Sequence, residues 1–438
     1  MITLQWFAVC LNTLSKYLNR ISIMVLKVHN ASRLVQHLHD PLFNNSISIM
    51  LTSFSSAGFG FVFWVLAAKL YSAEDVGTAT AMISSMGFII MLSRLGLDAS
   101  MIRFFPYNDK KRIFSTSLFV ATCCALLFGT IFILSVDLLA PELHLLKFPA
   151  NAALYLIFLA ANSGTALSCI SFVAVRKASF QLVQSIIVSS RILFLIPLAA
   201  FGAMGIFCSL GISLLIAIIT AYVLLAGSGV RPGFVADWKF LDKAFHYAAG
   251  NYIAGLFMAG PGLILPIMVL NMLGAEQAAY YFIAYAIATL LFKIPNAVST
   301  SLFVEGSHGE RMKKNIEKSL LFTYLLLIPA SGIMYLCSHW ILEAISAEYA
   351  AEGVILLQVM IISGLFTGLN FTYFAVQRVR KDIKELIVLS GSIALAVVGT
   401  AYVLMPIFGI VGAGYAWLAG NVTGNMLVAL MVWTRNDT

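Results

Sequence analysis

Long apolar stretches alternate with short polar segments along almost the whole chain. Each stretch holds roughly 20 mostly apolar residues, enough for an α-helix to cross a hydrocarbon core of ~30 Å. The pattern predicts an all-α polytopic membrane protein of about 12 transmembrane helices. The spans are expected at 46–69, 78–104, 113–137, 150–175, 182–201, 204–227, 244–272, 277–303, 319–341, 354–376, 384–405 and 407–433.

Composition excludes an ordinary soluble domain, because 61% of the 438 residues are hydrophobic and only 11% are charged. A net charge of +8 would suit nucleic acid, but its distribution follows membrane topology instead. With the N-terminus inside, 22 of the 27 Lys and Arg residues fall on the cytoplasmic side, including Arg378 and Arg380 in the tenth loop. The outer loops hold mainly acids. We therefore expect an inner (plasma) membrane protein with both termini in the cytoplasm and no nucleic-acid partner.

The two halves repeat short features at a nearly fixed spacing. Ala73-Glu74 matches Ala275-Glu276 at a spacing of 202 residues, and Arg176 matches Arg378 at the same spacing. Such spacing indicates a duplicated six-helix unit whose copies share one orientation in the membrane. The predicted parts are a basic amphipathic arm (1–41), an N-terminal six-helix bundle (42–227), a cytoplasmic linker (228–243) and a C-terminal six-helix bundle (244–434).

The stretch from Asn44 to Lys111 carries short motifs that resemble a known family. They are the run Phe63–Gly77 (FWVLAAKLYSAEDVG), the tripeptide Leu95-Gly96-Leu97, and Arg103-Phe104-Phe105-Pro106. This pattern resembles the polysaccharide transporter family of O-antigen and related oligosaccharide flippases. That family shares a superfamily with the multidrug and toxin extrusion (MATE) transporters and the lipid II flippase.

The resemblance implies a MATE-like fold and a flippase function in cell-surface polysaccharide synthesis. The expected substrate is a polyprenyl-(pyro)phosphate-linked oligosaccharide, moved from the cytoplasmic to the outer leaflet by alternating access through a cationic cavity. Membrane lipids and other polysaccharide-assembly membrane proteins are the further partners expected. No cofactor or metal is expected.

Three cations fall inside predicted spans, where an unpaired charge is costly and usually faces a cavity or a partner. Arg191 lies near the middle of the fifth span and Lys293 lies within the eighth, each without a carboxylate at similar depth. We predict that both bind the anionic head of the substrate; the alternative is a structural cation whose stem extends to the interface. Arg94 is a third candidate, although Asp98, one turn later, is an alternative partner.

Other candidates carry amide groups or proline. Asn251 and Asn370 are predicted to contact sugar, with helix capping as the alternative for Asn251 and interhelical hydrogen bonding as the alternative for Asn370. Pro261 and Pro266 should interrupt the seventh helix and permit a gating bend; a static kink is the alternative.

Two other functions remain open. A MATE-like antiporter of small molecules or drugs would share the fold, but such coupling commonly uses buried carboxylates, and here every Asp and Glu lies at a span end or in a loop. A major-facilitator transporter also has six plus six helices. However, the second loop of such a transporter carries an acidic and basic signature that residues 96–112 of this chain do not reproduce. A membrane glycan polymerase or acyltransferase usually needs a large outer loop or a buried acid, His or metal cluster, so an enzyme is not expected.

Overall fold

A computed structural model describes residues 41–105, 109–175, 177–230, 233, 237–307 and 312–436. The predicted N-terminal arm lies outside these residues except for Pro41. Within the described part the secondary structure is entirely helical, as the hydropathy pattern predicts.

The first half contains six apolar segments. Three of these segments are divided into two helices or are extended by a short helix. The elements are α3 (Pro41–Leu70), α4 (Ala73–Ser93), α5 (Leu97–Phe104), α6 (Lys110–Leu134), α7 (Val136–Leu139), η1 (Pro141–Lys147), α8 (Pro149–Ala174), α9 (Ala178–Ser189), α10 (Arg191–Leu195), η2 (Ala199–Phe201) and α11 (Gly202–Gly227).

The second half consists of six long helices with very short connections. They are α12 (Trp238–Leu273), α13 (Ala275–Ser307), α14 (Met312–Glu343), α15 (Ala347–Arg380), α16 (Ile383–Phe408) and α17 (Ile410–Asn436).

Ten helices in the described residues are long and apolar enough to cross a membrane, and two shorter apolar helices, Ser55–Leu70 and Ser179–Leu195, occupy the first and fifth predicted spans. Large apolar side chains remain exposed on the outside of the bundles, among them Leu134 and Leu336. Since a water-soluble protein rarely exposes so much contiguous apolar surface, these side chains suit contact with lipid.

Side-chain caps explain where several helices begin. Ser72 accepts a hydrogen bond from the backbone N–H of Asp75 at the start of α4, and Ser346 accepts one from Tyr349 at the start of α15. Asp237 does the same for Phe240 at the start of α12. Each cap satisfies one of the N–H groups that have no partner within the first helical turn.

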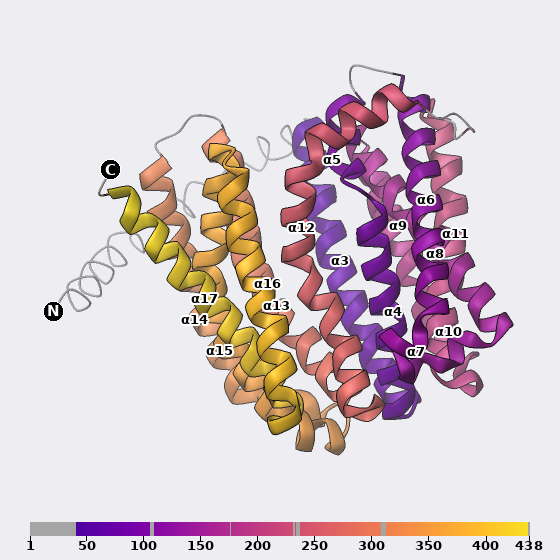
Figure 1. Cartoon of the computed structure of the whole chain (residues 1–438), viewed down its shortest axis with the longest axis vertical. Coiled ribbons are helices and arrows are strands. Elements are labelled where there is room, and N and C mark those ends of the chain that lie inside the picture. Colours follow the sequence, from indigo (N-terminus) through magenta and orange to yellow (C-terminus); the bar gives the residue numbers. More distant parts are fainter. Residues whose placement is uncertain are drawn as a thin grey trace, which may run out of the picture.

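The helices form two six-helix bundles in which equivalent pairs pack together (Figure 1). In the first bundle α3 packs on α9, α6 on α8, and α8 on α11. The matching pairs of the second bundle are α12 with α16, α14 with α15, and α15 with α17. The two ribbon groups meet near the lower edge of Figure 1 and diverge toward its upper edge.

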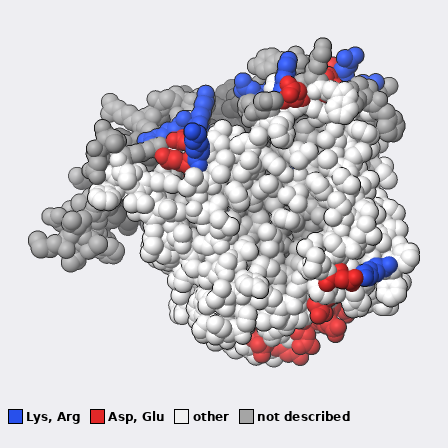
Figure 2. Space-filling view, viewed as in Figure 1, with Lys and Arg blue, Asp and Glu red and all other residues white. Residues whose placement is uncertain are grey.

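Charge separates along the same direction. In Figure 2 the visible face has a broad uncharged band, with most Lys and Arg at the upper edge and mainly Asp and Glu at the lower edge. Glu74, Glu276 and Glu348 occupy the first turns of α4, α13 and α15 at the acidic end. Negative charge at a helix N-terminus is favourable, and the apolar band between the two charged ends fits a bilayer.

The bundles are in close contact at the acidic end. A Cβ atom placed on Gly77 of α4 would lie 1.7 Å from the carbonyl oxygen of Ala275 in α13. Only glycine allows this approach between the two backbones. Nearby, the Trp64 ring of α3 packs edge-on against Phe282 of α13, with ring centroids 4.6 Å apart.

Toward the basic end, α12 links the bundles. Ser100 donates a hydrogen bond to the Ala244 carbonyl (3.0 Å), and Tyr252 donates one to the Leu92 carbonyl (2.7 Å). On its other side α12 packs against α16, where a Cβ on Gly250 would lie 2.5 Å from Ile383. The helix therefore contacts both bundles while belonging in sequence to the second.

Three expectations about the second half need correction. α12 runs without interruption through Gly260–Gly262, so the expected break of the helix is wrong. Pro261 and Pro266 remove backbone donors without ending α12, and their gating role stays a prediction. α12 also begins at Trp238, within the predicted linker, where Asp237 is the cap, so Asn251 lies well inside the helix and caps nothing. Finally, α15 continues to Arg380, which places Arg378 on a helix and not in a loop.

Candidate functional site

Arg191 is the first residue of α10, directly after the fifth span departs from helix at Ser190. Its guanidinium carbon lies 4.3 Å from the centroid of the Phe63 ring in α3. A Cβ on Gly60, one turn earlier in α3, would lie 3.5 Å from its Nη2 atom. Glycine and a phenyl face thus make room for the guanidinium between α3 and α10, in a cation–π arrangement.

The charge of Arg191 is not neutralised by a carboxylate in the described residues. Its buried Nε atom also has no hydrogen-bond partner there. A buried polar donor without a partner costs free energy, and the cost is larger for a charged group. Arg191 therefore has the unpaired positive charge expected of a residue that binds an anion.

Lys293 is exposed on α13 and, within the described part of the chain, makes no ion pair. Asn296 and Thr300 are three and seven residues further along the helix, so they share its face. Both are exposed as well. The eighth span consequently presents an ammonium group, an amide and a hydroxyl on one face.

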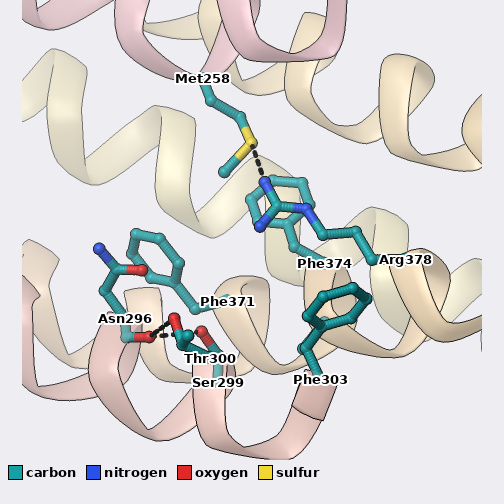
Figure 3. Close-up of a pocket in the computed structure, with 9 residues that line it drawn as sticks. Met258, Asn296, Ser299, Thr300, Phe303, Phe371, Phe374 and Arg378 are labelled. Atoms are coloured by element: carbon teal, nitrogen blue, oxygen red, sulfur yellow. Dashed lines mark hydrogen bonds between the residues drawn. The ribbon is translucent and has the colours of Figure 1, made fainter. Parts of the chain in front are cut away.

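A cavity of about 260 Å³ lies beside this face, between α12, α13 and α15 (Figure 3). Asn296 and Thr300 line one side, and Arg378 of α15 enters it from the opposite side. The other lining residues are mostly apolar or small: Met258, Ser299, Phe303, Phe371, Phe374 and Ala375.

The guanidinium of Arg378 lies 3.6 Å from the thioether sulfur of Met258 in α12. Sulfur is a weak acceptor, and a guanidinium has five N–H donors. Among the described residues Arg378 makes no ion pair, although a carboxylate is the usual partner of such a group. Most of its donor capacity is therefore available to a ligand in the cavity.

Asn251 is exposed on α12 and lies seven residues, about two helical turns, before Met258. Residues at this spacing lie on the same face of a helix. Of the sequence-predicted residues, Lys293 and Asn251 thus lie on helix faces that continue into the cavity, whereas Arg191 belongs to the first bundle.

Arg94 forms an ion pair with Asp98, with 3.2 Å between Nη1 and Oδ2 and both side chains about one-third exposed. Arg94 therefore has the local partner, Asp98, that was the alternative to substrate binding. The pair spans the sharp turn between α4 and α5, where Leu95 and Gly96 have positive φ angles of 49° and 76°.

Asn370 is 2% exposed between α15 and α17. Its Nδ2 atom donates to the backbone carbonyl of Asn421 (3.1 Å), and Asn421 in turn donates to Ser363 (3.0 Å). A Cβ on Gly424 would lie 2.7 Å from the Asn370 amide oxygen, so the space is filled. Asn370 fits the interhelical alternative and does not reach the cavity.

Sequence reasoning missed Arg378, Asn296 and Thr300. The hydropathy pattern ends the tenth span at residue 376 and so predicts a loop position for Arg378, whereas α15 extends to Arg380. The available signal was the period of the polar residues after Lys293, which recur at 296 and 300 on one helical face.

One curated relative matches part of this chain. A putative O-antigen transporter of Shigella flexneri is 26% identical over 167 residues, which is 35% of this chain. The match spans only 40% of the length of that relative.

Solved structures show the fold. An inward-facing multidrug resistance MATE family transporter of the MOP superfamily superposes with a TM-score of 0.68 at 15% identity, over 89% of this chain and 98% of that one. The lipid II flippase MurJ, in an inward closed conformation, gives a TM-score of 0.71 at 14% identity, over 88% of this chain and 87% of its own. The predicted MATE-like arrangement of two six-helix bundles is confirmed.

These proteins are transporters and flippases by name, and with the apolar helices they indicate a multi-pass protein of the plasma membrane. Residues 42–303, more than half of the chain, match the family described as polysaccharide biosynthesis protein. The resemblance carried by Phe63–Gly77 is thereby confirmed, and the chain belongs to the polysaccharide biosynthesis protein family.

Proposed function

We propose that this protein is a flippase that moves a polyprenyl-(pyro)phosphate-linked oligosaccharide from the cytoplasmic to the outer leaflet for cell-surface polysaccharide synthesis. The observation that carries the proposal is the guanidinium of Arg191, which lies over Phe63 inside the first bundle and forms no ion pair within the described residues. A (pyro)phosphate supplies the negative charge that Arg191 lacks, and charge-assisted hydrogen bonds to phosphate are among the strongest in proteins.

Lys293 adds a second cation in the other bundle. Because Arg191 and Lys293 stand on different bundles, a substrate that binds both would couple the movement of one bundle to the other, as alternating access requires. We propose the basic end as cytoplasmic, since basic loops favour that side. The contact between Gly77 and Ala275 would then close the outer end.

The main alternative is a small-molecule or drug antiporter, because the fold is shared with a multidrug MATE transporter. Its substrates are commonly cations, which Arg191 and Lys293 would repel. An enzyme that polymerises or acylates glycans is the second alternative.

The test is leaflet-specific detection of a fluorescent polyprenyl-pyrophosphate oligosaccharide in proteoliposomes. Intact protein should translocate the lipid, whereas Arg191→Ala and Lys293→Ala should each slow it at least about ten-fold, the effect of losing a charged hydrogen bond. Arg112→Ala and Lys318→Ala are matched controls, since both cations are exposed near the N-terminal ends of α6 and α14, and these variants should behave as intact protein.

Circular dichroism and size-exclusion profiles must show that all four variants fold. Transport of a cationic drug without any lipid translocation would overturn the proposal and favour the antiporter. Equal loss of translocation in the control variants would also overturn it, because the effect would then reflect net charge and not the two intramembrane cations.

A further inference from the structure

The cavity beside Arg378 combines three kinds of contact in one place. Arg378 contributes a guanidinium that makes no ion pair with any described residue, and Asn296 contributes an amide. Three phenyl rings, Phe303, Phe371 and Phe374, complete the wall. The Phe371 and Phe374 rings pack edge to face, 6.3 Å between centroids, which fixes their orientation. Figure 3 shows these groups around one space.

The hydroxyl groups of Ser299 and Thr300 can act in the cavity only as hydrogen-bond acceptors. Thr300 and Ser299 both donate to the backbone carbonyl of Asn296, at 2.8 Å and 2.9 Å. Since a hydroxyl has one hydrogen and two lone pairs, both oxygens remain acceptors only. They match a ligand that carries hydroxyl donors, and the Asn296 amide can both donate and accept.

A planar guanidinium favours phosphate, and the amide and hydroxyl acceptors favour a polyhydroxylated ring. The phenyl faces suit the apolar C–H surface of that ring. Drug-sized ligands occupy cavities of about 300–1,000 Å³, so a cavity of about 260 Å³ suits one sugar unit with its phosphate and not a whole oligosaccharide.

We infer that this cavity is a binding site for a glycosyl phosphate, namely the sugar phosphate at the reducing end of the lipid-linked substrate, with Arg378 as its phosphate ligand. The inference rests on the proposed function for the source of that group. It adds a site in the second bundle, near the last turn of α15, that is separate from Arg191.

The position of Met258 gives this site a link to α12. The only polar contact described for the Arg378 side chain is the Met258 thioether, and a phosphate is a far stronger acceptor. A bound phosphate should therefore draw the guanidinium away from α12, the helix that links the two bundles. Occupancy of the cavity would then loosen one contact of that helix before translocation.

The test measures binding to the purified full-length protein in detergent by saturation-transfer difference NMR and competition titration. The probes are N-acetylglucosamine 1-phosphate, neutral N-acetylglucosamine, inorganic phosphate, and farnesyl-diphosphate-linked N-acetylglucosamine. The variants are Arg378→Ala, Arg378→Lys and Thr300→Val. Arg380→Ala is the matched control, because Arg380 is also exposed, lies two residues later on α15 and does not line the cavity.

We expect Arg378→Ala to weaken binding of both phosphorylated sugars by about ten- to one hundred-fold, with partial retention in Arg378→Lys, while Arg380→Ala changes it less than about two-fold. A stronger effect of Thr300→Val on the sugar phosphates than on inorganic phosphate would support the sugar contact. Tighter binding of the farnesyl compound than of the soluble one would support the lipid-linked source.

Unchanged binding in Arg378→Ala, or inorganic phosphate binding as tightly as the sugar phosphate, would overturn the site. The two proposals fail separately. If intact protein translocates lipid and Arg378→Ala leaves both binding and translocation unchanged, this site is wrong and the flippase function stands. If binding depends on Arg378 but intact protein translocates nothing, the glycosyl phosphate site stands and the flippase function is wrong.

Discussion

Arg191 lies over the face of Phe63, with 4.3 Å between its guanidinium carbon and the ring centroid. Phe63 is fully buried and packs in turn against Trp64. Trp64 contacts Phe282 of the second bundle. The candidate anion ligand is therefore held by a row of aromatic rings that ends at the interface between the bundles, so its position depends on how the bundles meet.

Replacing the ring under Arg191 should impair transport. Phe63→Leu removes a cation–π interaction worth about 0.5–2 kcal/mol, so we expect lipid translocation in proteoliposomes to fall by about 2- to 30-fold. Phe207→Leu is the matched control, because Phe207 is equally buried in the same bundle but packs on Tyr155 and Phe158. Equal losses in both variants would show that general packing, and not support of Arg191, is responsible.

The contact between bundles at the acidic end can be forced apart. Gly77→Ala places a methyl group against the Ala275 backbone, which cannot rotate away as a side chain would. We expect the distance between spin labels at positions 74 and 276, measured by pulsed electron paramagnetic resonance, to shift toward longer values. Gly58→Ala, where a Cβ meets nothing within 4 Å, should leave the distances unchanged. An unaltered distribution in Gly77→Ala would contradict the closed contact.

Asn370 should contribute to the stability of the protein, whereas Asn251 should contribute to transport. Asn370→Ala removes the Nδ2 donor that the side-chain oxygen of buried Asn421 accepts from, and should lower stability by about 1–3 kcal/mol. The loss would be measured as a lower melting temperature in detergent. Asn251 is exposed, so Asn251→Ala should leave the melting temperature nearly unchanged and reduce translocation. A stable Asn370→Ala variant that cannot translocate would restore the earlier interpretation of Asn370 as a sugar ligand.

The Arg94–Asp98 pair should contribute locally and weakly. A double-mutant cycle of Arg94→Gln and Asp98→Asn is expected to give a coupling energy of at most about 1 kcal/mol in thermal or denaturant unfolding, because both side chains are about one-third exposed. The double variant should keep translocation activity. A loss as large as that of Arg191→Ala would instead identify Arg94 as a substrate ligand.

The sequence by itself determined the helices and their order. Apolar stretches of membrane length can satisfy their backbone groups only within a helix, so hydropathy indicates the succession of the spans, although not where each helix begins and ends. The spacing of 202 residues likewise indicates two similar bundles, and the run Phe63–Gly77 resembles the family whose match to residues 42–303 confirms it. The isolation of Arg191 is also indicated by the sequence, because no predicted span carries a carboxylate at a similar depth.

The tertiary structure alone decided which polar side chains face a cavity. In the sequence, Asn370 and Asn296 are both amides within predicted spans. In the structure, Asn370 is hydrogen-bonded to Asn421 between two helices, whereas Asn296 lines the cavity. Arg378 reaches that space only because α15 extends past the predicted end of its span. Helix rotation and the approach of neighbouring helices depend on packing between residues distant in sequence, for which a hydropathy pattern carries no information.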